Sequence, residues 1–249
     1  MTAPSSVPPV VRVVIPTYDE ADNALPMCDA VLAQLSAHGW DGHVLIVDDN
    51  SPDGTGEIVA GAAARNPRIG VLRRTGKDGL GVAYRDGFRR ALREGADAVC
   101  QMDCDFSHRP EDLAALAQLV LDGRADVAIG SRYVPGGGTS DWSRIRLVLS
   151  RIGAAWCRMV LGVRVRDISG GFKAWAPAAL TVAVDQAHSA GFAFQAEATF
   201  LASRAGYRAV EVPITFQERA AGESKMSPRI TIEGAWRLVA LRWAHRGGR

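Results

Sequence analysis

Residues 10–20 have the sequence VVRVVIPTYDE, and the pattern in this stretch decides the fold. The first six residues are almost all apolar and β-branched, which predicts a buried strand that ends at Pro16. Polar residues 17–20 follow at once. Residues 45–50 repeat this order, because LIV is followed there by two aspartates and an asparagine. Strands that end in polar residues are typical of a parallel sheet that binds a ligand at its carboxyl edge.

The same alternation of apolar strands and amphipathic helices extends outward along the first half of the chain. We expect strands at Val10–Ile15, His43–Val47, Ile69–Leu72, Ala98–Met102 and Val127–Gly130. We expect helices at Asn23–His38, Gly54–Arg65, Gly79–Glu94 and Pro110–Leu121. This order predicts an α/β fold with a Rossmann-type, mostly parallel sheet and helices on both faces.

The alternation stops after Gly130. A glycine-rich loop at Tyr133–Ser140 leads into a basic amphipathic helix over about Trp142–Leu161, and a last helix spans about Arg229–His245. These two helices would form a C-terminal extension of the sheet. No convincing linker separates the parts, so we expect one domain over residues 1–249.

Charge is distributed unevenly along the chain. Residues 1–139 carry 13 Lys and Arg against 19 Asp and Glu, whereas residues 140–249 carry 16 against 8. An acidic front half suits a metal site, and a basic back half suits phosphate groups or an anionic membrane surface. A chance scatter of solvated charges gives the same counts. Nothing in the composition indicates nucleic acid as a partner.

The sequence also predicts the compartment. The four cysteines form no CxxC pair, so reduced, buried thiols are expected. No apolar run approaches the ~20 residues that span a bilayer, and residues 1–9 lack the features of a signal peptide. We therefore expect a cytoplasmic protein.

Asp103 and Asp105 follow the strand expected over residues 98–102. Alternate residues of an extended chain point to one side, and two carboxylates at this spacing suit Mg²⁺ or Mn²⁺ shared with a diphosphate. An Asp-rich turn that caps a helix at Pro110 would explain the same residues without a metal.

Three further features carry weaker signals. Asp48 suits a ribose hydroxyl or a base edge, but it also begins a turn sequence, so we expect both roles, with Asp53 and Gly54 serving the turn. The loop at residues 76–81, GKDGLG, fits no phosphate-loop spacing, which favours a turn before a helix. A lone histidine, His108, is more often structural than a ligand.

Taken together, these motifs resemble the family-2 glycosyltransferases, in particular the dolichol- or polyprenol-phosphate mannosyltransferases. The matching segments, in family order, are VIPTYDE at 14–20, VDDNSPDGT at 47–55, GLGVAY at 79–84, MDCDFSH at 102–108, GSRY at 130–133, DISGGF at 167–172 and RAAGESKM at 219–226. The later segments are the more specific to enzymes that act on lipid phosphates. The resemblance spans nearly the whole chain and implies a GT-A-like fold.

The resemblance implies roles by position. Nucleotide-sugar binding falls to Pro16, Tyr18, Glu20, Ile46, Asp48, Asp103, Cys104, Asp105, Ser107, Arg132, Arg219 and Lys225. The metal, Mg²⁺ or Mn²⁺, falls to Asp103 and Asp105, and the acceptor phosphate falls to Arg132, Arg146 and Ser150. Asp105, Arg132 and Arg146 would carry the catalysis. Residues 10–130 would form the nucleotide-sugar and metal half, and residues 131–245 the acceptor half.

The sequence departs from the family pattern at three positions. Ser107 stands where some members have glutamine, Cys104 where alanine is common, and Asp19 where asparagine is commoner. None of these changes removes the expected site, but they leave the preferred metal open.

The implied reaction is inverting transfer of mannose from GDP-mannose to a polyprenyl (dolichyl) monophosphate, a β-D-mannosyltransferase activity. A phosphate monoester has its second pKa near 6, so the acceptor is largely a dianion at neutral pH and needs no general base. Arginines would neutralise and aim it, while the metal would neutralise the leaving diphosphate.

Other functions stay open on sequence alone. A polyprenyl-phosphate glucosyltransferase that uses UDP-glucose would share these motifs. A non-catalytic nucleotide-binding subunit is a second alternative, which the presence of both aspartates argues against. A dinucleotide-dependent dehydrogenase would need GxGxxG after the first strand, where this chain has Pro16-Thr17-Tyr18.

The expected acceptor is a lipid, so we expect peripheral docking on the cytoplasmic face of a membrane. The basic face of residues 142–161 and the indoles of Trp236 and Trp243 would contact the surface. Alternatively, the apolar side of each helix packs on the core, or a separate membrane-anchor protein holds the enzyme at the bilayer.

Overall fold

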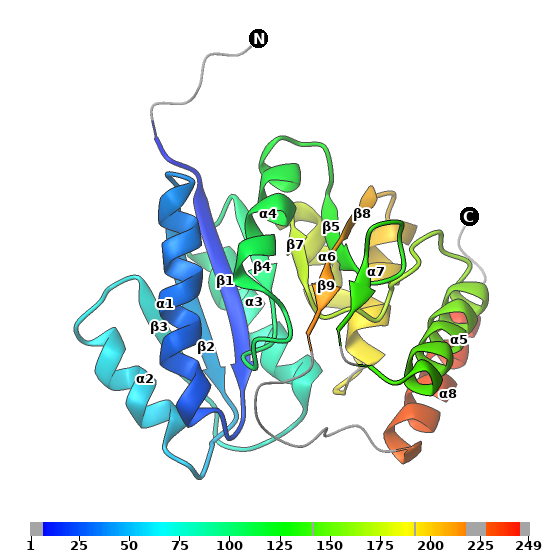
Figure 1. The fold of residues 1–249 in the computed structure, drawn as a ribbon, viewed down its shortest axis with the longest axis horizontal. Coiled ribbons are helices and arrows are strands. Elements are labelled where there is room, and N and C mark those ends of the chain that lie inside the picture. Colours follow the sequence, from blue (N-terminus) through cyan, green and yellow to red (C-terminus); the bar gives the residue numbers. More distant parts are fainter. Residues whose placement is uncertain (1–6, 141, 192, 218–227, 245–249) are drawn as a thin grey trace.

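The computed structural model describes residues 7–140, 142–191, 193–217 and 228–244, with side chains of the last segment described from Trp236 onward. Within these residues, a seven-stranded sheet has the order β3-β2-β1-β4-β7-β5-β8 (Figure 1). Its strands are β1 (Val10–Thr17), β2 (Asp41–Asp48), β3 (Ile69–Arg73), β4 (Ala98–Gln101), β5 (Val127–Ser131), β7 (Lys173–Trp175) and β8 (Ala209–Pro213). β7 runs antiparallel to both of its neighbours, and every other pair in this sheet is parallel. Two short strands, β6 (Gly138–Thr139) and β9 (Thr215–Phe216), form a separate parallel pair.

Helices cover both faces of the sheet. They are α1 (Ala21–Ala37), α2 (Thr55–Ala63), α3 (Leu80–Arg93), α4 (Leu113–Leu121), α5 (Arg144–Leu161), α6 (Pro177–Gln186), α7 (Ala193–Arg204) and α8 (Pro228–Ala244), with a 3-10 turn, η1 (Pro110–Asp112), ahead of α4. Side chains of α1, α2 and α4 share one buried cluster with the sheet, and those of α3, α6 and α7 share another. α5 and α8 pack against each other at the right of Figure 1.

The two buried clusters explain the continuous apolar runs in the strands. Successive side chains of a strand point to opposite faces, so a strand covered on both faces must be apolar throughout. In β1, Val13 and Ile15 join the cluster of α1, while Val14 joins the cluster of α3. In β1 and β2, the polar side chains nearest the carboxyl edge therefore lie at the strand ends and in the loops that follow them.

The predicted fold class is confirmed. Each strand and helix expected in the first 131 residues is present, with its ends shifted by a few residues. The prediction that alternation stops after Gly130 is wrong, because α6, β7, α7 and β8 all follow that residue. Their pattern is hidden by buried polar side chains, such as Lys173 in β7 and Gln195, Glu197 and Thr199 in α7.

Most of the apolar side of α5 does not pack on the core. Five of its large apolar side chains are 54–75% exposed, namely Ile145, Val148, Leu149, Ile152 and Met159. Ala154 and Leu161 are buried, and Trp156 and Cys157 pack against the cluster of α3. Core packing of this helix, the alternative to surface docking, therefore applies only to part of it. Among the residues with a described structure, no helix is both long and apolar enough to cross a bilayer.

Two helical glycines give a matched test of the packing between α3 and the sheet. A Cβ at Gly87 would overlap the side chain of Val14 and lie 2.8 Å from Cγ2 of Val47, whereas a Cβ at Gly61 in α2 meets only the Arg65 guanidinium, at 3.9 Å. Gly61→Ala should raise the free energy of unfolding by about 0.5–1 kcal/mol, because alanine favours the helix. Gly87→Ala should lower it by about 1–3 kcal/mol through overpacking. Urea denaturation of both variants measures the difference, and equal stabilisation by both would contradict this description of the core.

Candidate active site

The loops after β1 and β2 are joined by hydrogen bonds at the carboxyl edge of the sheet. The N–H of Glu20 donates to Thr55 Oγ1 at 3.1 Å. The Asp53 carboxylate accepts the N–H of Ala21 at 2.9 Å and that of Thr55 at 3.0 Å, so it links the first turns of α1 and α2. Gly54 has a φ of 86°. The expected turn role of Asp53 and Gly54 is confirmed.

Backbone strain is concentrated at this edge. Among the described residues, three non-glycine residues have positive φ: Asp19 at 57°, Asn50 at 57° and Phe106 at 58°. Each lies in the loop that follows a parallel strand, β1, β2 or β4. Such conformations are uncommon, cost about 1 kcal/mol or more, and gather at functional sites.

Asp48 lies buried at the end of β2 and accepts three hydrogen bonds. Thr17 Oγ1 and Ser51 Oγ donate to its Oδ1, at 3.3 and 2.5 Å, and the Ser51 N–H donates to Oδ2 at 3.2 Å. A carboxylate has about four acceptor positions, so these bonds leave room for about one more donor. Asp48 therefore serves the turn and retains limited capacity for a ligand hydroxyl.

The other residues expected to hold the nucleotide divide into two groups. Pro16, Tyr18 and Glu20 are half-buried at the same edge. Ile46 is fully buried within the core, and Cys104 is buried with its thiol pKa raised by burial, so neither side chain is at the surface of the site. Arg219 and Lys225 lie outside the described residues.

The loop at residues 76–81 contacts the site through a cation–π interaction that was not expected from the sequence. Lys77 Nζ lies 3.3 Å from the centre of the Tyr18 ring. A Cβ at Gly81 would collide with the Ser189 carbonyl oxygen, and one at Gly79 would press on the Ala190 carbonyl. The two glycines thus allow the backbone of residues 189–190 to pack closely against the start of α3. This agrees with the expected turn before a helix at residues 76–81.

Asp103 and Asp105 follow β4, but the chain is bent rather than extended over residues 104–108, where Phe106 also has a positive φ. The expectation that both carboxylates project from an extended chain is therefore wrong. Asp105 is buried, and its Oδ1 accepts the N–H of Ser107 at 3.0 Å. The Asp103 side chain is 35% exposed. One carboxylate is fixed by the turn, and the other reaches solvent.

His108 supports this turn as a neutral ring. Its Nδ1 accepts the N–H of Asp103 at 3.1 Å, so the ring proton is on Nε2. Burial lowers the pKa of His108, although the neighbouring aspartates oppose the shift. The ring stacks on Phe172 with centroids 5.0 Å apart. The expected structural role of His108 is confirmed.

The donor set around these aspartates fits a divalent metal shared with a substrate. In the described part of the chain, no group of three or more His, Cys, Asp or Glu side chains is placed to hold a metal ion. Mg²⁺ and Mn²⁺ are commonly held by one or two carboxylates together with phosphate oxygens and water. Asp103 and Asp105 can supply the carboxylates, and a diphosphate the remaining oxygens.

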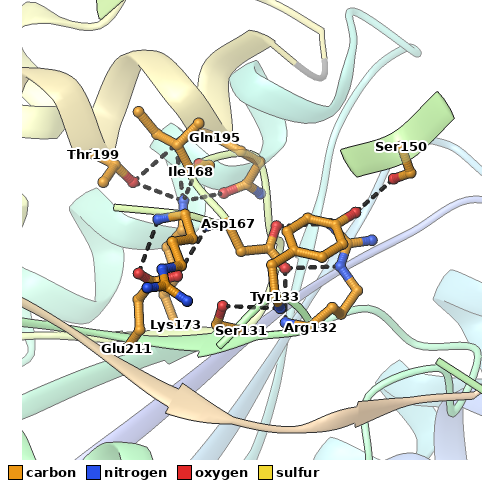
Figure 2. Close-up of polar contacts among 11 residues, drawn as sticks. Ser131, Arg132, Tyr133, Ser150, Asp167, Ile168, Lys173, Gln195, Thr199 and Glu211 are labelled. Atoms are coloured by element: carbon orange, nitrogen blue, oxygen red, sulfur yellow. Dashed lines mark hydrogen bonds and ion pairs between the residues drawn. The ribbon is translucent and has the colours of Figure 1, made fainter. Parts of the chain in front are cut away.

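Arg132 follows β5 and is held by Asp167. Its Nε and Nη2 donate to the two carboxylate oxygens at 2.8 and 2.7 Å, and its backbone N–H donates at 3.0 Å (Figure 2). The Asp167 side chain has no exposed surface, and that of Arg132 is 13% exposed. β5 runs parallel to β4, because each is antiparallel to β7. Arg132 thus lies at the same edge of the sheet as Asp103.

The residues expected to bind the acceptor phosphate are brought together. The indole of Trp142 lies 4.2 Å from the guanidinium carbon of Arg146 and 5.7 Å from that of Arg132. The Tyr133 hydroxyl is 2.6 Å from Ser150 Oγ (Figure 2). α5 therefore carries Arg146 and Ser150 back to the end of β5.

Phe216 in β9 joins the two sides of the site. Its ring meets His108 edge-on at 5.3 Å and Trp142 edge-on at 5.6 Å. Two buried polar atoms near this junction, Ser107 Oγ and Trp142 Nε1, have no hydrogen-bond partner among the described residues. Buried polar groups are normally satisfied, so these two suit hydrogen bonds to a ligand or water.

Lys173, which the sequence analysis overlooked, is fully buried beneath this edge. Its Nζ donates to the Gln195 carbonyl and to Thr199 Oγ1, both at 2.8 Å (Figure 2). Among the described residues, only neutral oxygens accept from it. Burial lowers the pKa of Lys173 to about 7, and the nearby Asp167 opposes this shift. Its only signal in the sequence is a single lysine between Phe172 and Ala174.

The structure thus combines a mostly parallel, GT-A-like sheet with an aspartate pair and clustered arginines at one edge. Residues 12–188 match the model of the family described as glycosyl transferase family 2, and the chain belongs to this family. It is 44% identical over 239 residues to the undecaprenyl-phosphate mannosyltransferase of Micrococcus luteus, covering 94% of this chain and 96% of that protein. It is 42% identical over 248 residues to the polyprenol monophosphomannose synthase of Mycolicibacterium smegmatis, covering 98% and 91%.

Solved structures share the fold at low sequence identity. The mannosyl-3-phosphoglycerate synthase of Rubrobacter xylanophilus has a TM-score of 0.65 at 17% identity, over 96% of this chain and 75% of that one. The glucosyl-3-phosphoglycerate synthase of Mycobacterium tuberculosis, in complex with Mn²⁺, UDP and glucosyl-3-phosphoglycerate, has a TM-score of 0.61 at 17% identity, over 95% and 79%. These likenesses confirm the GT-A-like fold.

The buried lysine predicts a specific dependence of stability on pH. Between about pH 7 and the unfolded pKa of 10.5, the unfolded chain binds a proton at Lys173 that the folded chain does not. Stability rises with pH wherever the unfolded state binds more protons. Relative to Lys173→Met, the wild type should therefore gain on the order of 2 kcal/mol between pH 7 and pH 9. Denaturant titrations of both proteins at pH 7, 8 and 9 measure this; a constant difference would mean that Lys173 keeps its proton.

Proposed function

We propose that this protein transfers mannose from GDP-mannose to a polyprenyl monophosphate, with inversion at the sugar carbon and with Mg²⁺ or Mn²⁺. The observation that carries the proposal is the likeness to two curated mannosyltransferases, whose names specify undecaprenyl phosphate or polyprenol, over nearly the full length of all three chains. The arginine cluster beside the aspartate pair supports it, because a phosphate acceptor needs cations near the donor diphosphate.

On the donor side, Tyr18, Glu20 and Asp48 would contact the nucleoside. Asp103 and Asp105 would hold the metal, which supplies positive charge to the leaving diphosphate when bound. Ser107, whose hydroxyl has no described partner, would donate to a phosphate or sugar oxygen. The strain at Asp19, Asn50 and Phe106 would keep these loops in the required shape.

On the acceptor side, the work of the chain is placement rather than proton removal. The acceptor phosphate is largely a dianion at neutral pH, so it attacks the sugar without a general base. Arg146 is exposed and would add a second cation, and Arg132 offers the terminal nitrogen that Asp167 leaves unused. Ser150 would add a hydroxyl donor. Such groups aim the acceptor in line with the bond that breaks.

The donor half, residues 10–130, and the acceptor half, residues 131–245, would act as one glycosyltransferase domain. The sheet supports this, because β7 of the acceptor half lies between β4 and β5. Neither half therefore has a complete sheet of its own.

A transfer assay tests the proposal. With radiolabelled GDP-mannose, UDP-glucose and a short-chain polyprenyl phosphate, we expect labelled lipid from GDP-mannose only, and none after addition of EDTA. Asp105→Asn keeps the shape of the turn but removes a charge, and should lower turnover by roughly 100-fold or more. Asp122→Asn, at an exposed position beyond α4, is the matched control. Labelled lipid from UDP-glucose instead of GDP-mannose would mean that UDP-glucose is the donor. Full activity of Asp105→Asn would overturn the metal site.

The same proposal places the enzyme at the cytoplasmic face of a membrane, docked through α5. The helix presents an exposed apolar side, and its exposed arginines include Arg144, Arg146, Arg151 and Arg158. Trp236 and Trp243 of the neighbouring α8 are 71% and 67% exposed. Apolar groups enter the lipid, arginines attract anionic headgroups at about 1 kcal/mol each, and tryptophan favours the headgroup layer.

Vesicle flotation tests the docking surface. The protein should float with anionic vesicles at low salt and be largely released at high salt, where charges are screened. Ile152→Asp on α5 should weaken flotation by roughly tenfold or more, because it places a charge in the lipid-facing side. Ile58→Asp, at an exposed isoleucine of α2, should have no effect. If the wild type stays in solution at every salt concentration, a separate anchor protein becomes the explanation.

A further inference from the structure

We propose that Asp167, itself fixed by Glu211, is the positioning residue that orients Arg132 toward the acceptor phosphate. In this arrangement Asp167 fixes the plane of the Arg132 guanidinium, and Arg146, exposed on α5, is the second cation of the site. The inference rests on the proposed acceptor site. It assigns a role to two acidic residues that lie far from each other in sequence and outside the donor site.

The geometry of the pair holds Arg132 in one orientation. Asp167 accepts from Nε, from Nη2 and from the backbone N–H of Arg132, at 2.7–3.0 Å. The side chain and the end of β5 are therefore held by one carboxylate. A bidentate pair fixes the plane of the guanidinium, which leaves Nη1 as the terminal nitrogen with a defined direction.

Asp167 is itself held in place by Glu211. The Glu211 carboxylate accepts the backbone N–H of Arg166 at 2.8 Å and that of Asp167 at 2.9 Å (Figure 2). Glu211 lies in β8, which pairs in parallel with β5, and is in register with Ile129. The loop that carries Asp167 is thereby tied to the strand beside the one that ends at Arg132.

Stability alone does not explain this buried ion pair. Asp167 has no exposed side-chain surface, and burying an ion pair commonly costs as much in desolvation as the attraction returns. Apolar residues of similar volume would serve stability as well or better. A buried pair at this edge is therefore better explained by what it orients than by what it stabilises.

Arg146 differs from Arg132 in exposure. Arg146 is exposed on α5 and stacks on Trp142, the same indole that lies near Arg132. One cation is fixed by a carboxylate and nearly buried, and the other stands at the surface. An incoming dianion would be attracted by Arg146 and aligned by Arg132.

A double-mutant cycle tests this with a water-soluble, short-chain polyprenyl phosphate, so that membrane docking does not enter. Asp167→Ala should lower kcat/KM for the acceptor by roughly 10- to 100-fold, the effect of a lost charge-assisted contact. GDP binding, measured by titration, should be unchanged. In an Arg132→Ala background the same change should cost less than about twofold, because Asp167 acts through Arg132. In an Arg146→Ala background, Asp167→Ala should lower kcat/KM by the same factor as in the wild type.

A second variant separates orientation from folding. Single changes leave a buried charge unpaired and should lower the melting temperature, whereas Arg132→Met with Asp167→Leu removes both charges and should recover it. Activity of this double variant should stay at the level of Arg132→Ala. The inference is wrong if the double variant recovers activity together with stability while the wild type remains active. It is also wrong if Asp167→Ala lowers kcat/KM by its full factor in the Arg132→Ala background. Failure of the wild type to use any polyprenyl phosphate would overturn the proposed function and this inference with it.

Discussion

The constraint on which the structure depends is the burial of parallel strands on both faces. β1, β2 and β4 pair in parallel, and helices cover each side, so their middle residues must be apolar. Polar groups are thereby concentrated toward the strand ends, and parallel strands end at one edge. Thr17, Asp48 and Asp103 are thus brought together by the same requirement that buries Val13 and Ile46. Hydrogen bonds between the loops, and three strained residues, then fix the shape of that edge.

The acceptor side is organised differently, by polar contacts inside the protein. β7 lies between β4 and β5 and is antiparallel to both, so β4 and β5 run in the same direction. Arg132, at the end of β5, therefore lies at the same edge as the aspartates. Behind that edge, Asp167 and Glu211 form partly buried hydrogen bonds and Lys173 forms buried ones, and together they join β5, β7, α7 and β8 (Figure 2). Partly satisfied polar networks are costly in a protein interior, so a network of this kind specifies one arrangement of its members.

These two kinds of organisation explain why the sequence predicts the first half of the sheet but not the polar contacts of the second half. The period of apolar residues predicts β1 to β5 and their helices, because packing there follows simple rules. It misses α7 and β7, since Gln195, Thr199 and Lys173 look like surface residues and are buried only because they satisfy one another. The spacing of Asp103 and Asp105 predicts a metal site. It does not predict the bend, which leaves Asp105 buried and Asp103 partly exposed. No local pattern predicts that Asp167 holds Arg132, because the contact joins residues 35 positions apart.

The exposed apolar side of α5 would determine how the enzyme meets a substrate that is embedded in a membrane. The exposed apolar side of this helix and Arg146 belong to a single rigid cylinder about 10 Å across. With that side resting on lipid, the proposed phosphate site lies at a fixed height above the hydrocarbon. The enzyme then searches a plane rather than a volume, and its rate follows the mole fraction of acceptor in the surface. Adding inert lipid would slow the reaction at constant bulk concentration of both reactants, and membrane composition would regulate an enzyme that contains no regulatory domain in its described residues.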